Sequence, residues 1–160
     1  MSTLSAQTVL QWAMEIERNG EAFYRTVAAA SQDREVRNLL QDLAHQEGRH
    51  YRTFERMLAD APTAPAEEAA ADNDRAYLET ALAGALLGPD KGLERARQAQ
   101  TEEQALRAAL AFEKDTLLFF YELAEAVPES QLAAVRAVID EERDHLHQIA
   151  RVLQSGPWVP

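Results

Sequence analysis

Two acid–histidine sets carry the residues in this chain whose types and spacing could do chemistry together. In each set a Glu is followed 29 or 30 residues later by a Glu-x-x-His motif, and the second set repeats the first with offsets of 96, 95 and 95 residues. Glu and His three positions apart project from one face of a helix. Two such helices, each beside a helix that carries one further Glu, would supply the ligands of a two-metal site inside a four-helix bundle. The predicted ligands are Glu17, Glu47, His50, Glu113, Glu142 and His145.

A single Glu-x-x-His motif would be weak evidence for metal binding in a chain so rich in acidic residues. All four histidines have an acid three residues earlier, and these include the pairs Asp42–His45 and Asp144–His147. Those two histidines lie on the opposite side of their helices from the predicted ligands, so we expect them on the surface. Two motifs in register, each preceded by a Glu that faces the core, indicate metal binding. A bundle without metal is the alternative.

Four long amphipathic segments must position these residues. Each predicted carboxylate ligand lies seven residues, or two helical turns, from an apolar residue on either side, so all four face the core. Four unpaired carboxylates in a core would be severely destabilising, whereas two divalent cations would balance their charge. The segments run from 5 to 30, from an Asp33 N-cap to 59, from a capping box at 101–104 to 124, and from 129 to a stop at Gly156-Pro157.

The connections between the segments predict the topology. Ser31-Gln32 and Val127-Pro128 are tight breaks, so each helical pair forms an antiparallel hairpin. Residues 60–100 begin with a Pro- and Ala-rich stretch and include a predicted helix over 74–87. A connection of this length lets the second and third long helices run parallel. We therefore expect an all-α four-helix bundle, with two antiparallel hairpins joined by a long crossover, as one domain over residues 1–160.

The sequence around the ligands resembles that of rubrerythrin-like proteins of the ferritin-like superfamily. The stretches that carry the resemblance are 13–24 and 112–121, together with both Glu-x-x-His motifs. The resemblance implies a ferritin-like bundle in which Glu17 and Glu113 are terminal ligands, Glu47 and Glu142 bridge two metals, and His50 and His145 bind one metal each. It also implies that Tyr24 and Tyr121 hydrogen-bond the carboxylates.

The same resemblance implies the cofactor and the reaction. Two iron ions are expected, and manganese or another divalent metal would suit the same ligands. The expected activity is reduction of hydrogen peroxide or O₂, and Gly20 would leave room for a diatomic molecule beside the metals. Many rubrerythrins carry an additional Glu where this chain has Thr116, which makes a ferroxidase or iron-storage protein the first alternative. A metal-free helical interaction scaffold is the second. The chain has no Cys, so the electron donor must be separate.

Composition limits the remaining partners. The net charge is −11 and no basic stripe is visible, so nucleic acid is not expected as a partner. No apolar run is long enough to span a membrane, and no signal peptide is visible, so a cytoplasmic location is expected. A homodimer is expected because ferritin-like hairpins pair easily. The tail 157–160 has no predicted role.

Overall fold

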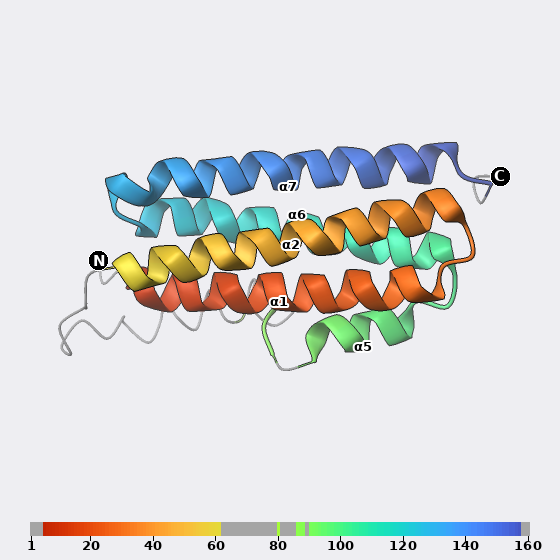
Figure 1. The fold of residues 1–160 in the computed structure, drawn as a ribbon, viewed down its shortest axis with the longest axis horizontal. Helices are drawn as coiled ribbons and strands as arrows, with labels where there is room; N and C mark the ends of the chain where they lie inside the picture. Colours follow the sequence, from red (N-terminus) through yellow and green to blue (C-terminus); the bar gives the residue numbers. More distant parts are fainter. Residues whose placement is uncertain (1–4, 62–79, 81–85, 89, 158–160) are drawn as a thin grey trace.

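Five helices make up the described part of the chain in a computed structural model, which describes residues 5–61, 80, 86–88 and 90–157 (Figure 1). No strand occurs among these residues. The predicted all-α bundle is therefore confirmed. The helices are α1 (Ala6–Ala30), α2 (Arg34–Asp60), α5 (Lys91–Gln98), α6 (Glu102–Ala126) and α7 (Glu129–Ser155).

Side-chain caps fix where three of the long helices begin. The Ser5 hydroxyl accepts a hydrogen bond from the Thr8 amide before α1, and the Asp33 carboxylate accepts one from the Val36 amide before α2. Thr101 caps α6 in the same way, as the predicted capping box requires. The Gln104 side chain, however, accepts from the Gln100 amide at 2.8 Å. These bonds satisfy amides that the first helical turn leaves without partners.

The long helices form two antiparallel hairpins, α1 with α2 and α6 with α7, and α2 runs parallel to α6 (Figure 1). Glu102 at the start of α6 ties the hairpins together. Its carboxylate accepts hydrogen bonds from the Gln32 and Asp33 amides at 2.7 Å, within the turn between α1 and α2. The helix predicted over 74–87 lies almost wholly outside the described residues, as does the tail 158–160.

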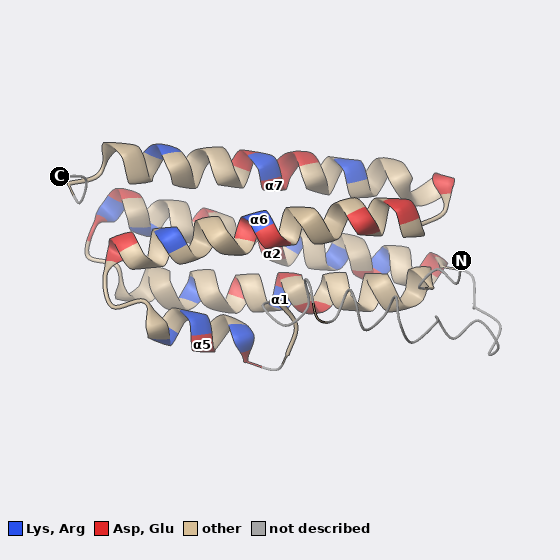
Figure 2. Cartoon of the chain, turned by 180° about the vertical axis from the view of Figure 1, so that it is seen from behind, with Lys and Arg blue, Asp and Glu red and all other residues tan. Residues whose placement is uncertain are grey.

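Helix α5 is an element that the sequence analysis did not predict. Half of its eight residues are charged, and Figure 2 shows basic residues along it; it buries only Gly92 and Ala96. Asn19 of α1 holds the segment before it, because the Asn19 amide nitrogen donates to the carbonyls of Leu86 at 3.1 Å and Gly88 at 3.2 Å. Tertiary contacts with α1 therefore position α5.

Replacing Gly92 by alanine is expected to push α5 away from α1. An added Cβ would lie 2.0 Å from the carbonyl oxygen of Asn19, and this backbone atom cannot move aside without disturbing α1. Overpacking of this kind destabilises by about 1–3 kcal/mol. Urea unfolding and amide exchange of residues 91–98 would measure the effect.

Gly48→Ala is the matched control, because its Cβ would meet only the flexible Glu21 carboxylate, at 3.5 Å. Alanine there should be neutral or stabilising by up to about 1 kcal/mol. Equal stability of the two variants would contradict the close packing of α5.

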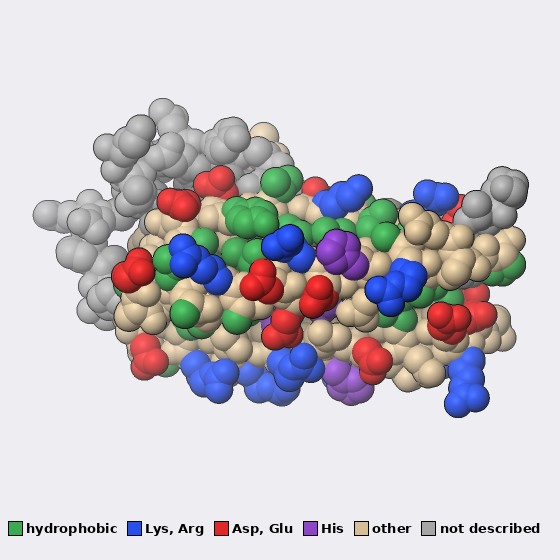
Figure 3. Space-filling view, turned by 90° about the horizontal axis from the view of Figure 1, so that it is seen from above, with side chains coloured by type: hydrophobic (Ala, Val, Ile, Leu, Met, Phe, Trp, Pro, Cys, Tyr) green, Lys and Arg blue, Asp and Glu red, His purple; other side chains and the backbone are tan. Residues whose placement is uncertain are grey.

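The apolar core consists of two clusters that lie on either side of a polar layer. One cluster includes Leu10, Ile16, Phe54, Phe120 and Val135, and the other includes Phe23, Val27, Leu43, Leu106 and Ile149. On the outer surface, the face in Figure 3 carries acidic and basic side chains intermixed, with hydrophobic side chains among them. The fold therefore places a layer of polar side chains at mid-length, between two apolar blocks that exclude water.

Candidate metal centre

Each of the four long helices contributes one carboxylate to the central polar layer. These carboxylates are fully buried, and both imidazoles of the Glu-x-x-His motifs are at most 2% exposed. The contributing residues are Glu17 of α1, Glu47 and His50 of α2, Glu113 of α6, and Glu142 and His145 of α7. The six predicted ligands are thus brought together, whereas His45 and His147 are exposed, as expected.

The six side chains form two overlapping groups of four. In each group one oxygen or nitrogen atom per residue lies within 4.8 Å of the others. Glu47 and Glu142 belong to both groups. The first group adds Glu17 and His50, and the second adds Glu113 and His145. This is the sharing pattern that two bridging and two terminal carboxylates would give.

Both imidazoles direct Nδ1 into the cluster. Nδ1 of His50 lies 2.7 Å from Glu142 Oε1, and Nδ1 of His145 lies 2.9 Å from Glu142 Oε2. The outward Nε2 of His50 is paired with Glu141 at 2.9 Å, and that of His145 with Gln46 at 3.1 Å. A hydrogen bond at one ring nitrogen fixes the tautomer and leaves the other free to bind a metal.

Sequence reasoning missed Glu141 and Gln46. A signal was present, because each residue directly precedes the Glu of one Glu-x-x-His motif. On a helix the preceding residue is turned by about 100° from that Glu, toward the neighbouring helix. The residue directly before each motif therefore hydrogen-bonds the histidine of the other motif.

The buried polar atoms of the cluster have too few hydrogen-bond partners for a closed core. Among the described residues, neither oxygen of Glu17, Glu47 or Glu142 has an aligned hydrogen bond, and neither does Nδ1 of either histidine, despite the short approaches to Glu142. Buried polar atoms without partners are rare in proteins and call for an explanation such as a bound ion. Carboxylate oxygens with imidazole nitrogens are ligands that iron, manganese and zinc accept, so the cluster fits a pair of divalent cations.

Without a cation, the cluster is arranged to hold protons. Burial, together with neighbouring carboxylates, raises the pKa of Glu17 and of Glu47 well above the usual value and that of Glu113 to about 8. Burial alone would lower the pKa of His50, but the adjacent Glu142 raises it to about 9. Metal binding near neutral pH must therefore displace protons.

The melting temperature of the metal-free protein is expected to fall as pH rises from about 5 to about 9. Glu113 has a folded pKa of about 8 against about 4.3 when unfolded, so its protonated form is stabilised in the fold and that contribution fades as pH rises between these values. His50 acts in the same direction up to a pKa of about 9. Calorimetry after chelation would measure the slope.

Glu113→Gln removes one of these titrating groups and keeps its shape, so that variant should show a flatter profile. A melting temperature that stays level across this range would contradict the raised pKa values and show that the carboxyl groups are solvated.

The resemblance implied that both Tyr24 and Tyr121 hydrogen-bond the carboxylates, and only Tyr24 is in a position to do so. The Tyr24 hydroxyl donates a short hydrogen bond to Glu113 Oε1. The Tyr121 side chain is 49% exposed, so the prediction that it bonds a carboxylate is wrong for this structure. The offset of 96 that relates Glu17 to Glu113 relates Tyr24 to Phe120, which is fully buried. Tyr121 is one residue further along and is turned by about 100° onto the outer face.

The space beside Gly20 was expected to be open to a diatomic molecule, but it is filled. A Cβ at Gly20 would lie 2.7 Å from Glu47 Oε2, so the Glu47 carboxylate occupies the room that was assigned to a diatomic molecule. The same offset relates Gly20 to Thr116, whose buried hydroxyl has no hydrogen-bond partner among the described residues.

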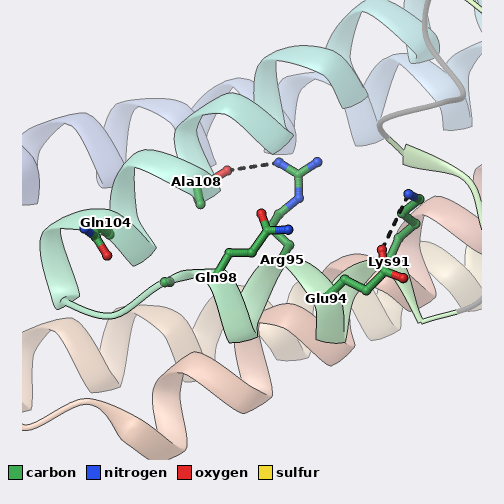
Figure 4. Close-up of a pocket in the computed structure, with 7 residues that line it drawn as sticks. Lys91, Glu94, Arg95, Gln98, Gln104 and Ala108 are labelled. Carbon is green, nitrogen blue, oxygen red and sulfur yellow. Dashed lines mark hydrogen bonds and ion pairs between the residues drawn. The ribbon is translucent and has the colours of Figure 1, made fainter.

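An open pocket of about 360 Å³ lies between α5 and α6, away from the ligand cluster (Figure 4). Arg95 extends from α5 toward the carbonyl of Ala108, and its guanidinium carbon lies 5.3 Å from the centre of the Phe112 ring. Phe112 in turn packs edge-on against Tyr24, with 6.4 Å between ring centres. Phe112 and Tyr24 thus connect Arg95 at the pocket to Glu113 in the cluster.

The fold and the site together define this protein as a four-helix bundle with a buried cluster of four Glu and two His at its centre. The sequence profile of the family described as Ferritin-like domain matches residues 5–139. The chain belongs to this family.

One solved structure extends the comparison to nearly the whole chain. It is described as a candidate ferritin-like diiron-carboxylate protein from Thermotoga maritima. The two chains are 22% identical, with a TM-score of 0.70, over 96% of this chain and 97% of that one. At this identity the likeness establishes the fold. No curated protein matches the sequence significantly.

Within the described ranges, none of the helices combines the length and apolar character needed to cross a membrane.

Proposed function

We propose that this chain is a di-iron carboxylate oxidoreductase of the rubrerythrin type, which reduces hydrogen peroxide in preference to O₂. The observation that carries the proposal is the sharing of Glu47 and Glu142 between two buried four-ligand groups. A single-metal site would use only four of the six side chains and leave one terminal carboxylate and one imidazole of the cluster without a metal. Two divalent cations would match all four carboxylates and give each imidazole a partner.

The protein residues have distinct roles in this proposal. Glu17 with His50, and Glu113 with His145, would each complete one metal position, and Glu47 and Glu142 would hold the two positions at a fixed separation. The apolar clusters on both sides keep bulk water out of the centre. When bound, two ferrous ions supply the pair of electrons that reduction of peroxide to two waters requires.

The protons and the electrons needed for turnover come from groups other than the six ligands. Reduction of one peroxide consumes two protons, and the Tyr24 hydroxyl beside Glu113 is a proton donor inside the layer. The chain has no Cys and hence no thiol or iron–sulfur centre of its own. A separate electron donor, either a protein or a small reductant, must therefore restore the reduced state.

A ferroxidase is the second candidate, and Thr116 is the observation that favours it. This buried residue stands where many rubrerythrins have an additional Glu, so the centre lacks the extra carboxylate. An iron-storage role would also require a cage of many subunits. The rubrerythrin-type activity is compatible with a small assembly, and we propose a homodimer.

Single-turnover kinetics of the ferrous protein would separate these functions. After anaerobic loading with Fe²⁺, stopped-flow traces with hydrogen peroxide are expected to be faster than traces with O₂, with no more than the loaded iron oxidised. Faster oxidation by O₂, with repeated additions of Fe²⁺ retained in a large assembly, would favour iron storage. Glu47→Gln with Glu142→Gln is the matched control and should show neither reaction.

A further inference from the structure

The residues that hydrogen-bond the outward Nε2 of the two imidazoles differ by one charge. Position 46 directly precedes Glu47, and position 141 directly precedes Glu142, so the internal repeat makes them equivalent. Gln46 accepts the hydrogen bond of His145 Nε2 at 3.1 Å, and Glu141 accepts that of His50 Nε2 at 2.9 Å. The contact is similar in both halves, but one acceptor is neutral and the other is an anion.

A second difference concerns the terminal carboxylates. The Tyr24 hydroxyl donates to Glu113 Oε1, whereas the repeat places Phe120 in the equivalent position. Both oxygens of Glu17 consequently have no hydrogen-bond partner in the described part of the chain. A donor hydroxyl draws negative charge from a carboxylate, so Glu113 has less to offer a cation than Glu17.

Both differences act in the same direction. An anionic partner raises the basicity of a metal-binding imidazole more than a neutral partner does. The position that includes Glu17 and His50 thus has the imidazole with the anionic outer partner and the terminal carboxylate that accepts no tyrosine hydrogen bond. Glu47 and Glu142 belong to both positions and do not discriminate between them.

Arg49 opposes this effect without removing it. Its guanidinium lies 3.3 Å from the same Glu141 oxygen that His50 contacts. The Arg49 side chain is 55% exposed and that of Glu141 is 44% exposed, so water screens this ion pair. The contact to His50 is shorter, and the imidazole end of it is buried.

We propose that the two metal positions are unequal, and that the position with Glu17 and His50 binds a divalent cation more tightly and fills first, because Glu141 supports His50 while Gln46 supports His145. Glu141 and Gln46 are positioning residues that act through the imidazoles. This proposal rests on the proposed function only in requiring that the cluster binds two cations.

Titration with Zn²⁺, followed by NMR of the imidazole nitrogens, tests the order of filling. The chain has four histidines, and the exposed His45 and His147 serve as internal references. Below one equivalent of Zn²⁺ the His50 signals should change while those of His145 stay, and the second equivalent should change His145. Simultaneous change of both, or His145 first, would overturn the proposal while leaving a two-metal site intact. Absence of any bound Zn²⁺ would overturn the proposed function as well.

Glu141→Gln separates the charge from the hydrogen bond, because glutamine keeps the acceptor that Gln46 already uses at the other position. Mutation of such an outer partner typically weakens metal affinity 10- to 100-fold, so the first binding step should weaken by about the lower factor when only the charge is removed. Exchanging the two residues, with Glu141→Gln and Gln46→Glu together, should make His145 respond first, because a full charge outweighs the neutral Tyr24 bond. An unchanged order in the exchanged variant would overturn the proposal.

Discussion

Replacing Glu47 and Glu142 together by alanine is expected to abolish metal binding. These are the two carboxylates that both four-ligand groups share, so their loss takes two ligands from each position. Each position then keeps one carboxylate and one imidazole, too few to hold iron inside a core. Anaerobic equilibrium dialysis with Fe²⁺ should show retention falling from two ions per chain to the background level.

The control for this variant is the pair His45→Ala and His147→Ala. Both histidines follow an acid at the same spacing as the predicted ligands, but both are exposed. Their removal should leave the iron content unchanged, and circular dichroism should show the glutamate variant still helical. Iron retained by the glutamate variant and lost from the histidine variant would place the metal on the surface.

Metal loading is expected to raise the melting temperature by about 10 °C at pH 7.5. A ligand that binds only the folded state stabilises by about 4 kcal/mol at a thousandfold excess over its dissociation constant, and about 1 kcal/mol corresponds to 2–4 °C in a chain of this size. The gain should increase as pH rises, because the metal-free protein loses stability as Glu113 and His50 release their protons. Calorimetry with and without chelator would measure it.

The glutamate double variant is the control here also, since it should melt at the same temperature with and without metal. If the wild-type protein behaved in that way at pH 7.5, the two apolar clusters alone would hold the bundle and the carboxylates would be hydrated.

The ligand cluster could be predicted from the sequence because helical periodicity links spacing to direction. Glu17, Glu47, Glu113 and Glu142 each lie two turns from apolar residues on both sides, and such residues must share a face. The tight breaks at 31–32 and 127–128 then set the antiparallel pairing. Those two facts bring the four acids to the same level of the bundle without any knowledge of side-chain contacts.

Features that depend on contacts between helices could not be predicted in this way. Helix α5 depends on Gly92 and on the bonds that Asn19 makes to carbonyl groups, neither of which gives a periodic apolar pattern. The partners of the imidazoles, Glu141 and Gln46, come from opposite hairpins and are paired only by the fold.

Iron stoichiometry after anaerobic reconstitution tests the central claim most directly. The protein would be incubated with excess Fe²⁺, freed of unbound metal under anaerobic conditions, and analysed for iron and protein. Two ions per chain are expected, because two four-ligand groups share Glu47 and Glu142 at the centre of the bundle. A value near zero, or one ion that survives removal of both glutamates, would contradict the assignment of this cluster as a two-metal centre.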